Sequence, residues 1–376
     1  MRKICYITGT RADFGLMHNV LDGINKHPNL SLSLIVTGMH LLSKYGETWK
    51  SIKEAGFQID AEIPVSLSGC SGAEMSIALG QQIIGCTQAL QEIEPDIVML
   101  LGDRGEMLAG ALAALHLNIP IVHLHGGELS GTIDESIRHA ISKISHYHFT
   151  ATNNSRKRLI KMGEDKDRIF VVGAPGLDAV YQEKIMNREK LFSRYKLNIN
   201  TSLLLIVFHP VVQQADKASE QIKAVLDAAL ETDMQLLILK PNADAGSNII
   251  AELIDGYAQV HNFQVKCHIP RNEFLSLIAH AEVMAGNSSS GIIEAASLNT
   301  PVVNIGDRQN RRERSLNVID VEPEKKSIYQ ALKQAQKIKN KNWKNVYGNG
   351  SASKKIIKHL QEISLASNIL EKVNAY

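Results

Sequence analysis

The chain has 376 residues, of which 44% are hydrophobic and 21% charged, and its formal net charge is +2. This length suits two domains of ~150–200 residues, and the near-neutral charge argues against a nucleic-acid partner, which needs a concentrated basic field. The four cysteines form no C-x-x-C pair, and no metal site is predicted. No apolar run is long enough for a signal peptide or a membrane span, so we expect a cytoplasmic protein without a membrane partner.

Short apolar runs alternate with amphipathic segments through the first half of the chain. Expected strands are 4–7, 32–36, 97–101, 119–124 and 148–151, and expected helices are 16–26, 41–55, 106–115 and 133–146. Strands that alternate with helices predict parallel βαβ units with helices on both faces of the sheet. The continuous apolar run at 97–101 is typical of a strand that is buried on both sides.

This alternation is interrupted at 177–200, where the sequence is polar and rich in Lys, Arg and Asn, and we expect a domain boundary at about 180–200. It then resumes with expected strands at 203–208, 236–239, 263–268, 283–285 and 302–305, and helices at 218–231, 248–256, 271–280 and 291–298. We predict an α/β protein with two Rossmann-like, doubly wound domains, at 1–180 and 200–350. A Lys-rich helix is expected over 351–376, its basic residues forming a solvated face.

The first expected strand leads into the segment Thr8-Gly9-Thr10-Arg11-Ala12-Asp13-Phe14-Gly15, which opens a helix. Ligands of open parallel sheets bind at the carboxyl ends of strands. Small residues allow a tight turn with exposed amides that attract anions, and the Arg11 guanidinium has the geometry to pair with phosphate. An ordinary strand–helix turn with a solvated arginine is the alternative.

The segment Gly286-Asn287-Ser288-Ser289-Ser290-Gly291-Ile292-Ile293-Glu294 lies at an equivalent strand–helix junction of the second domain. Backbone amides and serine hydroxyls at a helix start suit a pyrophosphate, and the Glu294 carboxylate suits the two hydroxyls of a ribose. A serine-capped helix with a surface glutamate is the alternative. The segment matches neither the P-loop nor the G-x-G-x-x-G pattern, so NAD is not implied and no cofactor is predicted.

Acidic and histidine residues follow successive strands of the first domain, in the segments 102–104, 123–128 and 130–139. Groups with separable pKa values at one sheet edge suit general acid–base catalysis, although each residue alone also fits a helix cap or an ion pair. No H-E-x-x-H spacing favours a metal. In the second domain His209 follows a strand and has a donor for phosphate, although a lone histidine is more often structural.

Together these segments resemble the UDP-N-acetylglucosamine 2-epimerase family, in particular its hydrolysing branch in sialic-acid-type biosynthesis. The resemblance runs from Thr8 to Arg314 and rests on TGTRADFG, HGGELSGTIDESIRHAISKISH, HIPRNEF, GNSSSGIIEA and TPVVNIGDRQ. It implies a GT-B architecture with the active site in the interdomain cleft, and a C-terminal helix that crosses back to the first domain. A homodimer or homotetramer is the corresponding expectation.

The resemblance also implies a reaction in which C2 loses a proton and C1 expels UDP, after which water adds to a glycal-type intermediate. It places Asp103 and Asp134 at catalytic carboxylate positions and Ser288, Ser289, Glu294 and Arg308 at UDP-binding positions. The full catalytic set that we predict is Asp103, His125, Glu128, Asp134 and Glu135. The predicted substrate- and UDP-binding set is Arg11, Asp13, His209, Asn242, His268, Ser288, Ser289, Glu294 and Arg308. The general base stays open.

One departure concerns the sugar. By this resemblance, family members that act on UDP-N-acetylglucosamine have a catalytic glutamate at the position where this chain has His125. A second branch, which acts on UDP-N,N'-diacetylbacillosamine, is more similar to the H-x-H-G-G-E and L-L-G-D-R-G-E patterns at 123–128 and 100–106. Imidazole is a competent acid or base near neutral pH, so the replacement keeps the chemistry possible while it changes the charge beside the sugar. A neutral histidine tolerates a less polar substrate face better than an ionised glutamate does, and we therefore favour the diacetamido sugar over UDP-N-acetylglucosamine. The sequence is also compatible with a GT-B glycosyltransferase, a non-hydrolysing epimerase or a catalytically silent nucleotide-sugar sensor.

Overall fold

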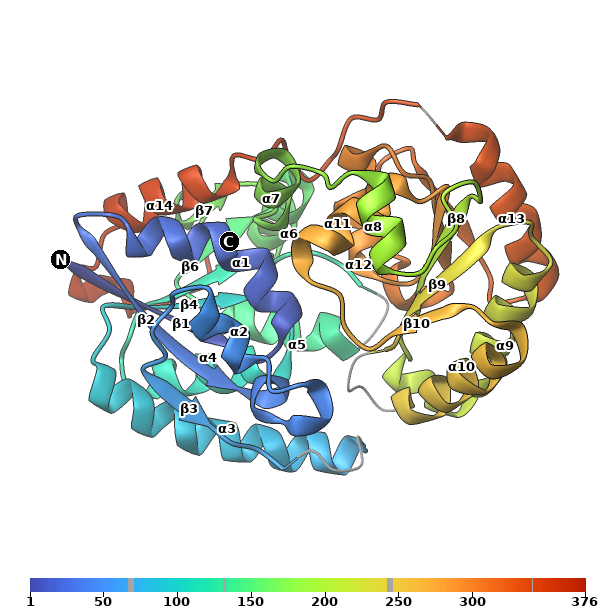
Figure 1. Ribbon diagram of the computed structural model, residues 1–376. Coiled ribbons are helices and arrows are strands. Elements are labelled where there is room, and N and C mark those ends of the chain that lie inside the picture. The colour runs from blue at the N-terminus through green and yellow to red at the C-terminus, as the bar shows by residue number, and fades with distance from the viewer. Residues whose placement is uncertain (67–70, 131–132, 242–245, 340) are drawn as a thin grey trace. The chain divides into compact units, whose positions relative to one another are not determined.

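The computed structural model describes residues 1–376 except 67–70, 131–132, 242–245 and 340 (Figure 1). The chain divides into two compact units. Unit 1 comprises Met1–Glu128, Asp134–Ala179 and Tyr347–Tyr376, and unit 2 comprises Leu129–Ile133 and Val180–Val346. Among the described residues, no helix is both long and apolar enough to cross a membrane.

The described part of unit 1 contains a parallel sheet with the strand order β3-β2-β1-β4-β5-β6-β7. The strands are β1 (Arg2–Thr8), β2 (Leu30–Thr37), β3 (Ala61–Ile63), β4 (Ile97–Leu101), β5 (Ile121–Leu124), β6 (Tyr147–Thr150) and β7 (Ile169–Val171). The order reverses between β1 and β4, and the loops that follow these two strands therefore flank the crevice in which doubly wound sheets bind ligands.

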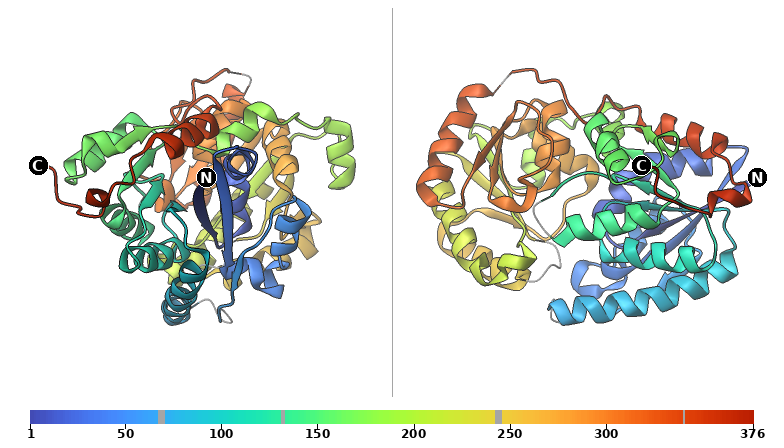
Figure 2. Two further views of the ribbon diagram at one scale, coloured as in Figure 1. Left: turned by 90° about the vertical axis from the view of Figure 1, so that its left-hand side faces the viewer. Right: turned by 180° about the vertical axis from the view of Figure 1, so that it is seen from behind.

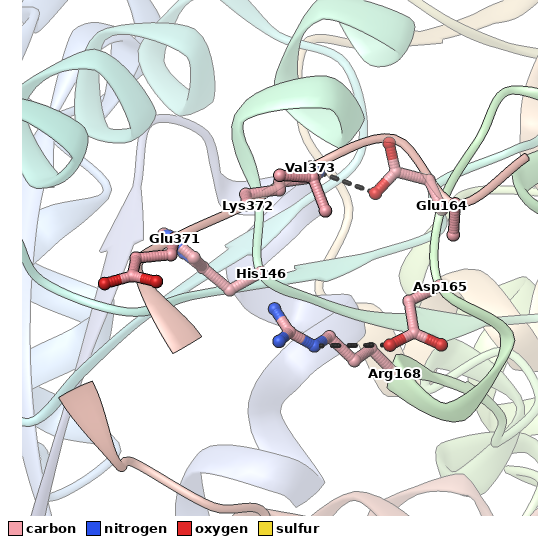
Figure 3. A pocket seen from close by; sticks show the side chains of 8 residues that line it. His146, Glu164, Asp165, Arg168, Glu371, Lys372 and Val373 are labelled. Atoms are coloured by element: carbon pink, nitrogen blue, oxygen red, sulfur yellow. Dashed lines mark ion pairs between the residues drawn. The ribbon is translucent and has the colours of Figure 1, made fainter. Parts of the chain in front are cut away.

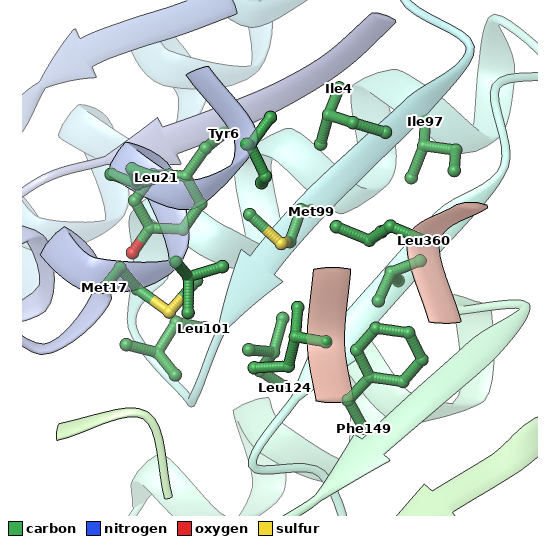
Figure 4. Close-up of a cluster of buried hydrophobic side chains, with 14 of the residues drawn as sticks. Ile4, Tyr6, Met17, Leu21, Ile97, Met99, Leu101, Leu124, Phe149 and Leu360 are labelled. Atoms are coloured by element: carbon green, nitrogen blue, oxygen red, sulfur yellow. The ribbon is translucent and has the colours of Figure 1, made fainter. Parts of the chain in front are cut away.

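Alternate residues of the unit 1 strands build two separate cores. Ile4 and Tyr6 of β1 pack on one face of the sheet, with helix α1 (Arg11–Asn25) and helix α14 (Ala352–Glu362) (Figure 4). Cys5 and Ile7 point to the other face, where helix α3 (Gly72–Ile93) and helix α4 (Gly105–His116) cover them. This alternation is the two-residue period of a strand that is buried on both sides.

The C-terminal helix α14 lies beside α1 within unit 1 (Figures 1 and 2). Its first two amides, from Ala352 and Ser353, donate to the carboxylate of Asp178 at 2.9 and 2.5 Å. Asp178 is buried in helix α7 (Gly176–Gln182). Because these amides have no partner within their own helix, Asp178 supplies the cap that α14 needs.

Unit 2 repeats the doubly wound order in its described residues, as β10-β9-β8-β11-β12-β13. Its strands are β8 (Leu203–Val207), β9 (Gln235–Leu239), β10 (Gln264–Lys266), β11 (Val283–Gly286), β12 (Val302–Ile305) and β13 (Val318–Val321). Its helices include α8 (Arg188–Arg194), α9 (Ala218–Leu230), α10 (Ser247–His261), α11 (Arg271–His280), α12 (Ser289–Ile293) and α13 (Lys325–Ile338). The predicted fold class, two Rossmann-like parallel-sheet domains in one chain as in the GT-B architecture, is confirmed.

Several element boundaries differ from the prediction. The single helix expected over 41–55 is replaced by two short 3-10 turns and helix α2 (Trp49–Glu54). A left-handed residue at Gly46, with φ +85°, ends the second turn and prevents one continuous helix. The sequence interpretation also missed α3, α13, β13 and the short elements α6 (Asn153–Lys161) and β7. Helix α13 buries Ile328, Ala331, Leu332 and Ala335 at helical spacing, a periodic signal that was overlooked.

Candidate active site

The polar residues that follow β4 and β5 meet helix α5 (Ile133–Ile144) at the carboxyl edge of the unit 1 sheet. Arg138 of α5 forms an ion pair with Asp103, which follows β4. Its other partner is Glu128, which follows β5, with 3.5 Å between Arg138 Nη1 and Glu128 Oε2. Glu128 in turn contacts His125, and the four side chains form one connected cluster. Three of the five predicted catalytic residues, Asp103, His125 and Glu128, are therefore brought together.

His125 is held in an unusual backbone conformation directly after β5. Its φ is +61°, in the left-handed region that non-glycine residues rarely occupy. His125 Nδ1 lies 2.5 Å from Glu128 Oε1, and the two side chains are 12% and 3% exposed. Gly127, with φ +74°, allows the tight turn between them, because a Cβ there would lie 2.4 Å from the carbonyl oxygen of Ser155. The loop thus uses strained backbone to place a histidine against a buried carboxylate.

Asp134 and Glu135, the remaining predicted catalytic residues, lie in the first turn of α5. Asp134 stands four residues before Arg138 and therefore on the same helix face. Glu135 Oε1 lies 3.7 Å from His139 Nε2 on the neighbouring face. Burial lowers the pKa of His139, although the Glu135 carboxylate opposes this shift. The catalytic roles of Asp134 and Glu135 stay predictions.

His123, the first histidine of the H-x-H-G-G-E pattern, has a structural environment. It is fully buried in β5, its Nε2 lies 2.8 Å from the carbonyl oxygen of Gly102, and its Nδ1 lies 3.0 Å from Ser142 Oγ. Burial lowers its pKa to about 3. A carbonyl only accepts, so Nε2 carries the proton and Nδ1 accepts from the serine. Both ring nitrogens of His123 are therefore engaged in contacts within the sheet.

The loop between β1 and α1 is organised by Asp13. The amides of Gly9 and Thr10 donate to Asp13 Oδ2 at 3.1 and 2.8 Å, and the Thr8 hydroxyl donates to Oδ1. Burial raises the pKa of Asp13 to about 6, although the hydrogen bond from Thr8 lowers it. The amides of Gly9 and Thr10 therefore serve this carboxylate. Substrate binding by Asp13, and phosphate binding by Arg11 at the helix start, stay predictions.

In unit 2 the ends of β8 and β11 lie close together and are joined by hydrogen bonds, at the point where the strand order reverses. Gly286 has φ +129°, and a Cβ there would lie 2.1 Å from the carbonyl oxygen of Val207. The buried Asn287 side chain accepts from the His209 amide at 2.7 Å and donates to the His209 carbonyl at 2.8 Å. Only glycine tolerates this approach, and the asparagine fixes the position of His209 beside the serine-rich loop.

Other predicted nucleotide-binding residues surround the same asparagine. Arg308 Nη1 donates to the carbonyl oxygen of Asn287 at 3.3 Å. Ser288 is the N-cap residue of α12, its hydroxyl accepting from the Ser290 amide at 3.4 Å, and Ser289 is the first residue of that helix. Unit 2 thus brings His209, Ser288, Ser289 and Arg308 to one edge of its sheet.

Glu294 differs from its expected position. Helix α12 spans Ser289–Ile293 instead of the expected 291–298, and Glu294 lies at its C-terminal cap. Its side chain is 1% exposed and forms a two-fold ion pair with Arg271, one contact of which measures 3.0 Å. His268 is exposed in the segment before α11, and Asn242 lies outside the described residues. Ribose binding by Glu294 therefore stays a prediction.

The model of the family described as UDP-N-acetylglucosamine 2-epimerase matches residues 22–361. This chain belongs to the UDP-N-acetylglucosamine 2-epimerase family. A relative from Legionella pneumophila, named UDP-N,N'-diacetylbacillosamine 2-epimerase (hydrolyzing), is 49% identical over 376 residues, covering 100% of both chains. A relative from Neisseria meningitidis, named UDP-N-acetylglucosamine 2-epimerase, is 37% identical over 335 residues, covering 89% of this chain and 88% of its own length. The predicted membership of this family is confirmed.

The 2-epimerase fold is also recognisable from solved structures. The chain is similar to the crystal structure of a UDP-GlcNAc 2-epimerase from Neisseria meningitidis bound to UDP-GlcNAc, with a TM-score of 0.81 and 21% identity. The match covers 96% of this chain and 100% of the other. At this identity the likeness establishes the shared fold.

A small pocket of about 70 Å³ in this epimerase is lined by residues outside the predicted sets. It lies in unit 1 and is lined by His146, Glu164, Asp165, Arg168, Glu371, Lys372, Val373 and Ala375 (Figure 3). Lys372 Nζ lies 2.6 Å from Glu164 Oε2, and Lys143 Nζ lies 2.8 Å from Glu164 Oε1. His148 Nε2 contacts the same carboxylate at 2.9 Å. Several charges here hold the C-terminal segment in place, and none of these residues was in a predicted set.

Sequence reasoning missed two residues that organise the epimerase site. Arg138 is 1% exposed and bridges two carboxylates, although in the sequence it resembles an ordinary surface residue of an amphipathic helix. The available signal was its spacing from Asp134. Asn287, 1% exposed, belongs to the serine-rich loop, but no role was predicted for it. Its position beside a glycine that ends a buried strand was the corresponding signal.

Proposed function

We propose that this chain is a hydrolysing 2-epimerase that converts UDP-N,N'-diacetylbacillosamine and water into UDP and 2,4-diacetamido-2,4,6-trideoxymannose. The observation that carries the proposal is the 49% identity, over the full length of both chains, to the Legionella relative of that name. The cluster of His125, Glu128, Arg138 and Asp103 supports it, because it supplies imidazole and carboxylate groups at one sheet edge.

The proposed reaction begins with elimination. The C1–O bond breaks, its electron pair leaves with UDP, and a base removes the C2 proton to give a C1–C2 double bond. Bond cleavage at C1 gives the ring oxocarbenium character, which the nearby carboxylate of Asp103 or Asp134 stabilises. His209, Ser288, Ser289 and Arg308 bind the departing diphosphate, with Arg11 as a further phosphate contact.

Hydration completes the proposed reaction. Water oxygen adds to C1, and a proton is delivered to C2 from the opposite face, which inverts that carbon and releases the free sugar. An acid is needed at this stage where a base was needed before. His125 suits both stages, since imidazole exchanges protons near neutral pH. The reaction as written requires no cofactor and no metal.

The wider assignment is part of the same proposal. A hydrolysing 2-epimerase of this type would act in the cytoplasm, as a homodimer or homotetramer, and supply an amino sugar to sialic- or legionaminic-acid biosynthesis. The alternative substrate is UDP-N-acetylglucosamine, which would give N-acetylmannosamine. It is favoured by the 37% identical relative from Neisseria meningitidis that carries this name.

One NMR time course tests these assignments, with each of the two UDP sugars incubated separately in D2O without any acceptor. The proposal predicts stoichiometric UDP and a free 2-epimerised diacetamido sugar with deuterium at C2, formed faster than N-acetylmannosamine from the other substrate. Faster turnover of UDP-N-acetylglucosamine would favour the alternative. Deuterium in a UDP-linked sugar would identify a non-hydrolysing epimerase and overturn the proposal.

A further inference from the structure

Arg138 occupies the centre of the charged cluster in unit 1. It is 1% exposed and is one of the largest fully buried side chains in the described residues. Its guanidinium forms ion pairs with Asp103 and Glu128, and Glu128 contacts His125. We propose that Arg138 is a positioning residue that, through Glu128, orients the His125 ring with Nδ1 toward the carboxylate and leaves Nε2 as its acid–base atom. This inference rests on the proposed epimerase function.

The burial of Arg138 supports a specific role. A guanidinium remains charged at any physiological pH, and removing it from water is costly unless carboxylates surround it. Arg138 has two acidic partners, which come from two different strand ends, β4 and β5. Its planar fork suits two carboxylates at once, which a single ammonium group does less well. The arginine therefore sets the relative positions of Asp103 and Glu128.

The orientation of His125 follows from the charge of Glu128. One oxygen of Glu128 faces Arg138 and the other lies 2.5 Å from His125 Nδ1. A carboxylate beside a buried guanidinium is ionised and only accepts hydrogen bonds, so Nδ1 carries the proton. In neutral imidazole Nε2 then has the lone pair. The left-handed backbone of His125 limits the positions from which that nitrogen acts.

Asp103 connects the cluster around Arg138 to the proposed stabilisation of the oxocarbenium cation. Its side chain is 21% exposed, whereas Arg138 and Glu128 are 1% and 3% exposed. Asp103, one of the two carboxylates proposed for cation stabilisation, is thus the accessible end of the cluster, and the Arg138 guanidinium fixes its orientation. Because one guanidinium serves both carboxylates, loss of Arg138 would disturb Asp103 and His125 together.

The kinetic test compares Arg138→Lys and Arg138→Gln with Arg168→Gln as the matched control. Arg168 is an arginine of the same unit, paired with Asp165 at 3.6 Å and outside the cluster. We expect kcat to fall about tenfold for the lysine variant and about 100-fold or more for the glutamine variant. KM and the dissociation constant for UDP should change less than about threefold, because Arg138 has no assigned substrate contact. A glutamine variant with wild-type kcat would overturn the proposal.

The spectroscopic test reads the ring directly and needs no turnover. Long-range 15N–1H spectra of the 15N-histidine-labelled wild-type protein report which ring nitrogen carries the proton. His125 should show the Nδ1–H tautomer, whereas His123, whose Nε2 faces the Gly102 carbonyl, should show Nε2–H and serves as the internal reference. In Arg138→Gln the His125 signal should shift toward Nε2–H. A wild-type His125 already in the Nε2–H form would contradict the inference.

The two tests separate this inference from the proposed function. If wild-type protein turns over neither UDP sugar, the proposed function fails, while the tautomer of His125 still supports or refutes the orienting contact. If wild-type protein is active and His125 has the wrong tautomer, only the role of Arg138 fails. Should Arg138→Gln not fold, Arg138→Lys and the wild-type spectrum still decide the question.

Discussion

Unit 1 contains two buried His–Glu pairs with closely similar local chemistry and different surroundings. His125 and Glu128 lie 2.5 Å apart after β5, and His148 and Glu164 lie 2.9 Å apart, with His148 in β6. The first pair keeps a partly open histidine, 12% exposed, whereas both side chains of the second are 1% exposed. Exposure of the imidazole is thus the first difference between a candidate catalytic pair and a structural one.

The second difference is the supply of positive charge. Glu128 shares the Arg138 guanidinium with the carboxylate of Asp103, whereas Glu164 receives two ammonium groups, from Lys143 and Lys372. Burial opposes ionisation of Glu164, but the hydrogen bonds from His148 and the two lysines outweigh it and lower its pKa to about 2. The Glu164 carboxylate is thus surrounded by two ammonium groups and an imidazole, whereas the Glu128 pair includes a partly exposed imidazole.

The largest expected contrast comes from one matched pair of substitutions. His125→Asn keeps a donor for Glu128 near the position of Nδ1, tolerates the left-handed backbone and removes Nε2. His148→Gln keeps a donor for Glu164 near the position of Nε2. We expect kcat of His125→Asn to fall by about 10²–10⁴-fold, whereas His148→Gln retains wild-type kcat within about threefold. Steady-state assays of UDP release measure both.

Thermal melts of the same two variants provide the control. The His125→Asn protein should melt close to wild type, because its contact with Glu128 is preserved. Loss of kcat accompanied by a large fall in Tm would attribute the effect to folding and not to chemistry. Comparable turnover in the two variants would remove the distinction between the pairs.

Substitutions around the Glu164 pair should lower the stability of the fold more than substitutions at an exposed ion pair. Lys372→Met removes an ammonium that contacts Glu164 and donates to the carbonyl oxygens of Ser142 and Ser145. We expect the free energy of unfolding to fall by about 2–4 kcal/mol, because the buried Glu164 carboxylate loses part of the positive charge that compensates its burial. Lys358→Met, at an exposed pair with Glu362, should cost less than about 1 kcal/mol. Denaturant titration of both variants measures the two losses of unfolding free energy, and equal losses would contradict the expectation.

A smaller loss is expected at the cap of the C-terminal helix. Asp178→Ala leaves the amides of Ala352 and Ser353 without their carboxylate and should cost about 1–2 kcal/mol. Ser351→Ala is the matched control, because Ser351 is the N-cap residue of α14 but forms no capping hydrogen bond with its side chain. The control should melt near wild type. If the serine variant were the less stable of the two, the cap assignment would be wrong.

A further effect on stability is confined to acid. Glu164 has a folded pKa of about 2 against an ordinary value of 4.5, so its contribution to stability is present above pH 4.5. Between pH 4.5 and pH 2 the unfolded state binds more protons, and this contribution is lost as the pH falls. Glu164→Gln should therefore show a weaker decline of Tm over this interval than wild type. Parallel profiles of the two proteins would exclude this source of acid sensitivity.

The sequence predicted the layered fold well, because buried parallel strands such as Ile97–Leu101 are continuous apolar runs with no competing pattern. Helix interruptions such as the one at Gly46 depend on local backbone geometry and were not predicted. The long helix α3 was missed, since its residues are apolar around much of the circumference and several of them, including Ile77 and Ile84, are exposed.

The candidate site was only partly predictable for a similar reason. The junctions that follow β4 and β5 stand out as polar residues after apolar strands, which is how Asp103, His125 and Glu128 were found. Arg138 lies in the middle of a helix, where an arginine is usually solvated, and only the contacts of the folded chain show that it is buried. Pairings between residues on different elements depend on tertiary packing, which single-sequence patterns do not encode.

The most direct test of the account is the pair of variants Glu128→Gln and Glu164→Gln, each assayed for turnover of UDP-N,N'-diacetylbacillosamine and for Tm. The account predicts that Glu128→Gln loses about 100-fold or more in kcat, whereas Glu164→Gln keeps its kcat within about threefold while its Tm falls. Wild-type kcat in Glu128→Gln, or a comparable loss of kcat in Glu164→Gln, would contradict it.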